Sequence, residues 1–229
     1  FDSIEECFGS MTPYIYAIET GLSSNPLMNR SLSALDNVML VSNSDAHSPR
    51  NFGREANVFE VDRSKYSYDE FIRILREKDT SAFKFTIEFF PEEGKYHIDG
   101  CANCQFSCLP EQTKALNSQC PKCHRSLTIG VTSRVNDLAD RANVMPNGSV
   151  PFKSIVPLQE IIAEAIGMSG TGGKKVQEIY ETMIANIGNE FHILLDADRS
   201  AIDSIAGERI ADAINRVRSG QLTITPGDD

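Results

Sequence analysis

"VMLVSNSDAHS", residues 38–48, joins an apolar run to a polar loop that contains Asp45 and His47. The apolar run is typical of a buried strand, so the loop follows the carboxyl end of that strand. Ligands often bind at this position in α/β units. An aspartate and a histidine two positions apart on an extended segment project the same way and could share a metal ion. The alternative is a polar turn that caps the next helix.

The flanking sequence repeats the alternation of strand and helix. Residues 14–24, "YIYAIETGLSS", are predicted to form another strand that runs into a polar loop. Residues 67–78 are predicted to form a helix with Ser67 and Glu70 as a capping box. This pattern indicates an α/β unit, although two or three such units are too few to close a barrel.

The stretch "FKFTIEFFPEEGKYHID", residues 83–99, is predicted to be a β-hairpin that turns at "PEEG". Lys95 and His97 lie on the second arm, where they could meet an anionic substrate. The alternative is a solvated turn without a ligand. Residues 125–131, "RSLTIGV", are predicted to form one more strand.

Two C-x-x-C pairs with fifteen residues between them are the strongest chemical signal. Each pair brings two thiolates to one ion, and two pairs complete a tetrahedral site for structural zinc. Two disulfides or unrelated thiols are the alternative. Four protein ligands leave no open position, so the site would stabilise a fold and would not activate water. The predicted ligands are Cys101, Cys104, Cys120 and Cys123, with Cys108 left as a free thiol.

From about residue 131 the pattern is mainly helical. A short helix is predicted over residues 134–142, and three longer apolar stripes follow. "FHILLDA" (191–197) and "QLTITPG" (221–227) are predicted to be short strands. The stretch "GMSGTGGKK" (167–175) fails as a phosphate-binding loop, because Met168 stands where the motif requires glycine. It is predicted to be a flexible loop between helices.

The net charge of −10 argues against a broad, non-specific nucleic-acid surface. A local basic groove remains compatible with this charge, formed by Lys or Arg at positions 50, 54, 63, 65, 84 and 95. No stretch has the roughly 18 apolar residues that a membrane span requires. The acidic opening "FDSIEECFGS" is unlike a signal peptide, so a cytoplasmic location and no membrane partner are expected. We also expect a fragment of a longer protein.

Several motifs together resemble the endonuclease Q family. They are "AIETGLSSNPLMN", "SNSDAHSPRNFGREAN", "TIEFFPEEGKYHIDG", the paired C-x-x-C, "LTIGVTSRVNDLADR" and "GQLTITPG". The second of these resembles the last metal-binding segment of a polymerase-and-histidinol-phosphatase (PHP) domain. The resemblance covers nearly the whole chain in the family's order.

The resemblance implies an α/β fold made of three parts. Residues 1–82 would be the C-terminal part of a PHP-type (β/α) barrel, and residues 83–130 a β-hairpin with a four-cysteine, zinc-ribbon-like module. Residues 131–229 would be a mainly helical α/β domain. Asp45 and His47 would be catalytic metal ligands for Mg²⁺, Mn²⁺ or Zn²⁺, and Arg54, Lys95 and His97 are candidates for substrate contact.

The function implied is DNA-repair endonuclease activity, with cleavage 5′ to uracil, hypoxanthine, xanthine or abasic sites. DNA would be the partner, and a replication clamp is a second candidate. Two departures from the family pattern stand out: Cys101 replaces a common histidine, and the early His-x-His of a PHP domain is absent. The alternatives are a zinc-stabilised interaction module with an inactive PHP remnant, or a PHP phosphoesterase for small phosphates.

Overall fold

The computed structural model describes residues 1–94, 96–222 and 224. They form two compact units, and the division between the units falls after Phe152. No helix in these ranges is long and apolar enough to cross a bilayer. The three-part division expected from the resemblance stays a proposal.

The first unit contains short helices and strands. Its α-helices are α1 (Ile4–Phe8), α2 (Pro26–Asn29), α3 (Tyr68–Glu77), α4 (Pro110–Ala115) and α5 (Val131–Leu138). Its 3-10 turns are η1 (Gly9–Tyr14), η2 (Ser33–Asn37), η3 (Pro49–Asn51), η4 (Arg63–Lys65), η5 (Pro91–Glu93) and η6 (Ala102–Cys104). The strands are β1 (Ala17–Glu19), β2 (Met39–Val41), β3 (Ala56–Phe59), β4 (Phe83–Glu88), β5 (Asp99–Cys101), β6 (Phe106–Cys108) and β7 (Phe152–Ser154), and the division between the units falls within β7.

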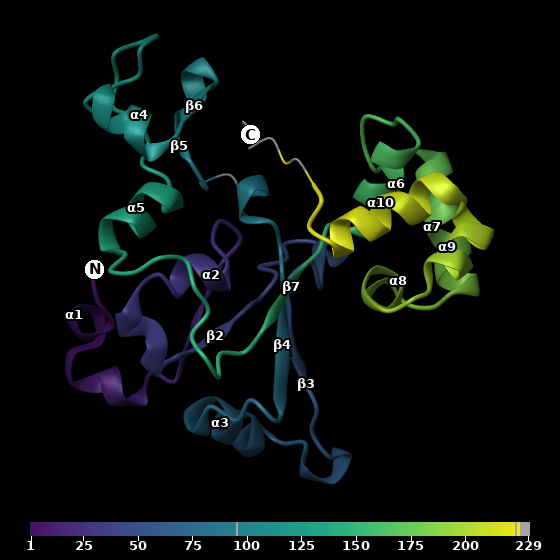
Figure 1. The fold of residues 1–229 in the computed structure, drawn as a ribbon, viewed down its shortest axis with the longest axis horizontal. Helices are drawn as coiled ribbons and strands as arrows, with labels where there is room; N and C mark the ends of the chain where they lie inside the picture. The colour runs from purple at the N-terminus through teal and green to yellow at the C-terminus, as the bar shows by residue number, and fades with distance from the viewer. Residues whose placement is uncertain (95, 223, 225–229) are drawn as a thin grey trace. The chain divides into compact units, whose positions relative to one another are not determined.

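These strands form three small sheets (Figure 1). β1 and β2 are parallel, with Ala17 opposite Met39, so both strands end at the same edge. β4 lies between β3 and β7. β5 and β6 form an antiparallel pair, with Asp99 opposite Cys108. The mixed α/β class predicted from the sequence is confirmed.

The predicted helix at residues 67–78 is confirmed as α3, and its ends follow local chemistry. Ser67 Oγ accepts a hydrogen bond of 3.2 Å from the Glu70 N–H, and Lys78 ends the helix with a left-handed backbone. Glu70 bonds to Arg73 on the next turn. The buried side of α3 packs in a core with Met39 of β2 and Phe83 of β4. This core supports β2, the strand that leads to the loop of residues 42–48.

The hairpin predicted over residues 83–99 is wrong. β4 forms as expected, but both of its edges are taken, one by β3 and the other by β7. The "PEEG" turn instead forms η5, and residues 96–98 form no strand. A Cβ atom on Gly94 would lie 2.5 Å from Ser23 Oγ, so this segment packs tightly against the loop after β1. The antiparallel pair in this region is β5 with β6.

The strand predicted at residues 125–131 is reduced to isolated bridges, such as the one between Thr128 and Gly100. The helix predicted over residues 134–142 is observed as α5, which begins and ends earlier.

The second unit is helical. Its helices are α6 (Leu158–Ala165), α7 (Lys174–Asn186), α8 (Glu190–Leu195), α9 (Arg199–Ala206) and α10 (Glu208–Arg218). α6, α7 and α10 confirm the three predicted stripes, and residues 167–173 form the predicted loop. The strand predicted over residues 191–197 is wrong, because Asn189 caps α8 and its Ile193 and Leu194 are buried. Of the strand predicted over residues 221–227, residues 223 and 225–227 lie outside the described ranges.

Candidate metal sites

The two C-x-x-C pairs meet as the sequence predicts. Their four sulfur atoms all lie within 4.8 Å of one another, and Cys101 Sγ is 3.7 Å from Cys123 Sγ. A tetrahedral zinc ion with bonds of about 2.3 Å to sulfur places its ligands about 3.8 Å apart. The donor set therefore fits zinc.

The surroundings of these sulfurs also favour a bound cation. Cys120 is fully buried, and its neighbours in the core of this module are Cys101, Cys108 and Leu127. The Cys123 thiol and burial raise the pKa of Cys104 to about 12. Burial also raises the pKa of Cys120, but hydrogen bonds from the Cys123 and Lys122 N–H groups outweigh it and lower that pKa to about 7. A divalent ion would stabilise the thiolates and supply cohesion that this small core lacks.

Cys108 and His124 lie outside the cluster. Cys108 Sγ is 3.2 Å from Thr113 Oγ1, and this pair is buried. His124 is exposed and has a positive φ of 60° where the chain leaves the second C-x-x-C turn. Among the described residues, the metal-compatible group contains the four predicted cysteines alone.

A buried carboxylate joins this module to the neighbouring helices. Asp99 is fully buried, and its Oδ1 accepts a hydrogen bond of 2.6 Å from the Gly130 N–H. Its Oδ2 accepts from the hydroxyls of Thr113 (2.5 Å) and Ser133 (2.6 Å). Asp99 therefore ties β5, which ends at Cys101, to α4 and α5.

Asp45 and His47 lie on an exposed loop, four and six residues beyond Val41, the last residue of β2. Asp45 has a left-handed backbone with φ of 43°, so the loop is not extended at this residue. The expectation that both side chains project the same way from an extended segment therefore does not apply. The tight turn brings His47 Nδ1 to 2.9 Å from the carbonyl oxygen of Asp45.

That contact determines what His47 can do. A carbonyl oxygen only accepts, so this contact requires a proton on Nδ1, and in the neutral ring Nε2 then carries the lone pair. Metal-binding histidines commonly show this arrangement, in which one ring nitrogen donates to a backbone carbonyl. The capping alternative is not supported, because η3 follows Ser48 and has no side-chain cap. Among residues 1–94, 96–222 and 224, no third ligand completes a group with this pair.

Two buried glutamates, Glu55 and Glu88, interact with Ser42 at the start of this loop, and the sequence patterns did not predict either. Glu88 at the end of β4 is fully buried, with its carboxylate 2.5 Å from Thr86 Oγ1 and 2.9 Å from Thr20 Oγ1. Glu55 is 2% exposed, and its Oε1 accepts from the Phe89 N–H at 3.3 Å. Burial raises the pKa of each to about 7. A glutamate within the apolar run of residues 83–90 was the available signal.

These raised pKa values predict a pH-dependent stability. Glu88 prefers its protonated form in the fold, so its contribution is complete below pH 4.5 and is lost as the pH rises through about 7. We expect Glu88→Gln to stabilise the protein at pH 8, by about 3 kcal/mol at most. At pH 5 the variant should match the wild type. Thermal unfolding at both pH values measures this.

The matched control for that experiment is Glu60→Gln. Glu60 is exposed and pairs with Lys84, which lowers its pKa. The control should show no gain in stability at pH 8. An equal gain in both variants, or a gain of Glu88→Gln at pH 5, would contradict the assignment.

The three predicted substrate residues have different surroundings. Arg54 is half-buried, donates from Nε to the Ser44 carbonyl at 3.3 Å and lies over the Phe89 ring at 5.6 Å. His97 is buried, with Nδ1 3.0 Å from the Ser23 carbonyl oxygen and Nε2 3.3 Å from Thr132 Oγ1. Lys95 lies outside the described residues. Arg54 thus contacts the loop of Asp45, whereas His97 links segments within the fold.

The predicted basic groove divides between two ends of the β3–β4 pair. Arg50 and Arg54 precede β3, whereas Arg63 and Lys65 follow it. Lys84 lies near the start of β4, which runs antiparallel to β3, and pairs with Glu60 at 2.9 Å. Among the described candidates, Arg50 and Arg54 are therefore the ones on the side of the Asp45 loop.

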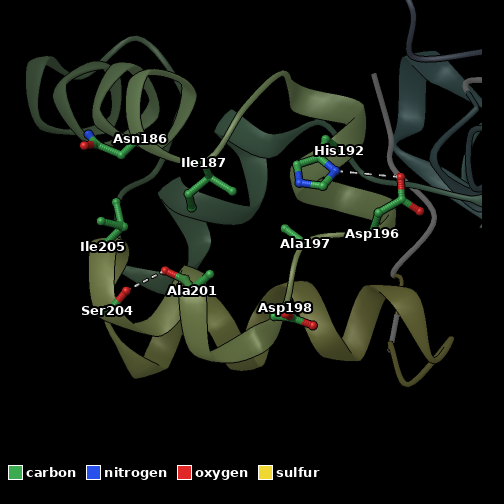
Figure 2. A pocket seen from close by; sticks show the side chains of 9 residues that line it. All are labelled: Asn186, Ile187, His192, Asp196, Ala197, Asp198, Ala201, Ser204 and Ile205. Carbon is green, nitrogen blue, oxygen red and sulfur yellow. Dashed lines mark hydrogen bonds and ion pairs between the residues drawn. The ribbon is translucent and has the colours of Figure 1, made fainter.

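The second unit contains a separate pocket of about 380 Å³ (Figure 2). Its walls come from the end of α7, from α8 and from α9: Asn186, Ile187, His192, Asp196, Ala197, Asp198, Ala201, Ser204 and Ile205. His192 Nδ1 lies 3.9 Å from Asp196 Oδ2. Its polar groups do not converge as a metal site, because they form no group of three ligands among the described residues.

Comparison with known proteins places these features in context. Residues 157–221 match the family described as the MJ0043 C-terminal domain. The uncharacterized protein MJ0043 of Methanocaldococcus jannaschii is 35% identical over an alignment of 229 positions, which covers 99% of this chain and 28% of that protein. The uncharacterized protein YqxK of Bacillus subtilis is 28% identical over an alignment of 216 positions, which covers 93% of this chain and 50% of that protein. The chain thus spans half or less of these relatives.

Solved structures match the chain more completely. A crystal structure of the lesion-specific endonuclease PfuEndoQ from Pyrococcus furiosus has a TM-score of 0.87 and 30% identity, covering 100% of this chain and 56% of that one. The same values hold for a crystal structure of Endonuclease Q in complex with a 27-mer duplex substrate that has an abasic lesion at the active site. The predicted resemblance to endonuclease Q is confirmed over the whole chain.

Proposed function

Since this chain resembles endonuclease Q over its whole length, we propose that it is part of a DNA-repair endonuclease. The enzyme would cleave the phosphodiester bond on the 5′ side of deaminated bases (uracil, hypoxanthine, xanthine) or abasic sites. The observation that carries the proposal is the 0.87 TM-score against enzymes described as lesion-specific or bound to a lesion-containing duplex. The chain covers 56% of those structures, so the activity is assigned to the full-length protein.

Asp45 and His47 would supply two ligands of the catalytic metal site. The Asp45 carboxylate is exposed, and His47 offers Nε2 because Nδ1 donates to the Asp45 carbonyl oxygen. A bound Mg²⁺, Mn²⁺ or Zn²⁺ would lower the pKa of a water molecule and stabilise charge on the scissile phosphate. Asp45 would hold a metal ion through its carboxylate oxygens, which are ligands that such divalent ions accept. The other ligands would come from outside this chain.

Arg54 and Arg50 would guide the DNA backbone toward that loop. Arg54 is held by the Ser44 carbonyl and by the Phe89 ring, so its charge has a defined place beside Asp45. Contacts of this kind position a duplex and carry little sequence information. Lys95 and His97 remain proposed substrate contacts. Lesion selection would require the damaged nucleotide to leave the base stack.

The four-cysteine module would fold the segment between β5 and α5 and take no part in hydrolysis. Its four sulfurs lie within 4.8 Å of one another and would complete the four-ligand shell of a zinc ion, leaving no position for water. Asp99 would fix the module against α4 and α5 through the three buried hydrogen bonds that it accepts. Residues 1–82 would then be the C-terminal part of a PHP-type barrel, and residues 131–229 a mainly helical domain.

The test uses the full-length protein with Mn²⁺ or Mg²⁺ and duplexes of one sequence. Each duplex carries a single uracil, hypoxanthine or abasic site, and an undamaged duplex is the control. We expect a nick on the 5′ side of the lesion and none in the undamaged DNA. Binding of DNA without nicking would favour the inactive-remnant alternative. Hydrolysis of small phosphate esters with no nicking would favour the phosphoesterase alternative.

A further inference from the structure

The backbone between β2 and Asp45 is held from the side by one amide side chain. The Ser42 N–H donates to Asn57 Oδ1 at 2.9 Å, and Asn57 Nδ2 donates to the Ser42 carbonyl at 2.7 Å. The same Nδ2 lies 3.3 Å from Asn43 Oδ1. Asn57 therefore engages two consecutive residues of the segment that leads to Asp45.

This pair of bonds forms on the edge of β2 that faces away from β1. The ladder between β1 and β2 ends with Glu19 opposite Val41. The Val41 carbonyl accepts from Thr20, and successive residues of a strand bond on opposite sides, so the Ser42 N–H and carbonyl point away from β1. A side-chain amide has the same donor and acceptor as a peptide group, so Asn57 bonds to Ser42 as a neighbouring strand would. We call the two hydrogen bonds between Asn57 and Ser42 the clamp. The backbone of Asn57 lies in β3 opposite Thr86 of β4, so the clamp is anchored in a three-stranded sheet.

The residue type supports a specific role. Asparagine is disfavoured in strands, where β-branched and aromatic residues are preferred. Asn57 nevertheless occupies an interior position of β3, beside Val58 and Phe59. Its side chain directs its hydrogen bonds to the segment of residues 42–43, not to β3 or β4.

Two further contacts restrain the same segment. Ser42 Oγ donates to the Ile87 carbonyl of β4 at 2.7 Å in a buried position. Arg54 Nε donates to the Ser44 carbonyl at 3.3 Å. Ser42 is therefore tied to β4 and Ser44 to the side chain of Arg54, and at Asp45 the chain turns into the left-handed region. The direction of that turn depends on how Ser42 and Asn43 are held.

We propose that Asn57 is a positioning residue that aims the Asp45 and His47 ligands and thereby sets the divalent-metal affinity of the site. The inference rests on the proposed function, because it takes these two residues to be metal ligands. Hydrogen-bonded groups behind metal ligands typically change metal affinity by about 10–100-fold when removed. Asn57 acts through the backbone and does not touch the metal or the DNA.

The experiment compares Asn57→Leu and Asn57→Ala in the full-length protein. Leucine keeps the side-chain volume and alanine does not, so an effect shared by both comes from the amide. Hydrogen–deuterium exchange of the peptide covering residues 42–48 reports the clamp. Calorimetric titration with Mn²⁺ reports the affinity, and nicking at saturating Mn²⁺ reports the chemical step. Ile74→Val, on the buried side of α3, is the control for a general loss of stability.

In both Asn57 variants we expect exchange in residues 42–48 to rise at least about tenfold and Mn²⁺ to bind about 10–100-fold more weakly. Nicking at saturating Mn²⁺ should stay within about threefold of the wild type, because excess metal refills the site. Ile74→Val should change neither exchange in this segment nor Mn²⁺ affinity. Weaker Mn²⁺ binding with an unchanged nicking rate at saturation distinguishes a positioning role from a general loss of folded protein.

Unchanged exchange or unchanged Mn²⁺ affinity in both variants would overturn the role of Asn57, and so would an equal shift in Ile74→Val. A wild type that binds Mn²⁺ but nicks no lesion would refute the endonuclease activity alone, since exchange and titration still decide the role of Asn57. A wild type that binds no Mn²⁺ at all would refute both.

Discussion

Replacing Cys120 with serine is expected to remove the metal from the four-cysteine site and to unfold the segment between β5 and α5. The Cys120 sulfur is fully buried and is one of four donors within 4.8 Å. Structural zinc contributes roughly 10–16 kcal/mol of apparent binding energy in small modules. The core here consists of cysteines, Leu127 and little else, so no apolar cluster would replace that energy.

The measurement is zinc content after extensive dialysis, together with limited proteolysis. The wild type should retain about one zinc per chain, and Cys120→Ser should retain almost none and be cut between residues 101 and 125. Cys108→Ser is the matched control, because Cys108 is also buried but its sulfur contacts Thr113 and not the cluster. Zinc retained by Cys120→Ser, or lost by Cys108→Ser, would refute the ligand assignment.

Asp45→Asn is expected to abolish lesion-dependent nicking while leaving the fold intact. Asparagine keeps the shape of the side chain but loses the charge and one oxygen donor for the metal. A loss of about 4 kcal/mol of transition-state stabilisation lowers the rate by on the order of 10³-fold. Asp45 is exposed and supports no helix cap, so the unfolding temperature should change little.

The test measures nicking of the uracil duplex by the full-length protein with Mn²⁺. Asp62→Asn makes the same substitution at another exposed aspartate, whose role is to cap η4 through the Ser64 N–H. Asparagine can keep that cap, so this control should retain wild-type nicking. Undiminished nicking by Asp45→Asn would show that the catalytic site lies elsewhere.

Local sequence patterns were sufficient for features that depend on neighbouring residues. The spacing of Cys101, Cys104, Cys120 and Cys123 predicts their convergence, because each pair is brought together by its own short turn. The start of α3 follows from Ser67, whose hydroxyl caps the helix that it begins. The stripes of α6, α7 and α10 follow from their 3.6-residue periodicity.

Short apolar runs did not distinguish a strand from a helix, because periodicity needs a longer stretch to be recognised. Residues 191–197 are too few to separate the period of a strand from that of a helix. The cap from Asn189 and the burial of Ile193 and Leu194 among helices favour α8. Likewise, residues 83–90 were correctly predicted as a strand, but the partners of β4 come from β3 and β7.

The sequence by itself determined the four-cysteine cluster, the main helices and the place of Asp45 and His47 after a strand. The tertiary structure alone decided which groups surround that loop. Glu88, Asn57 and Ser42 come together because the end of β2, in one sheet, lies against β3 and β4 of another, and nothing in their spacing along the chain predicts this. Contacts between distant segments depend on how whole strands pair, and pairing is set by burial and hydrogen bonding across the entire sheet.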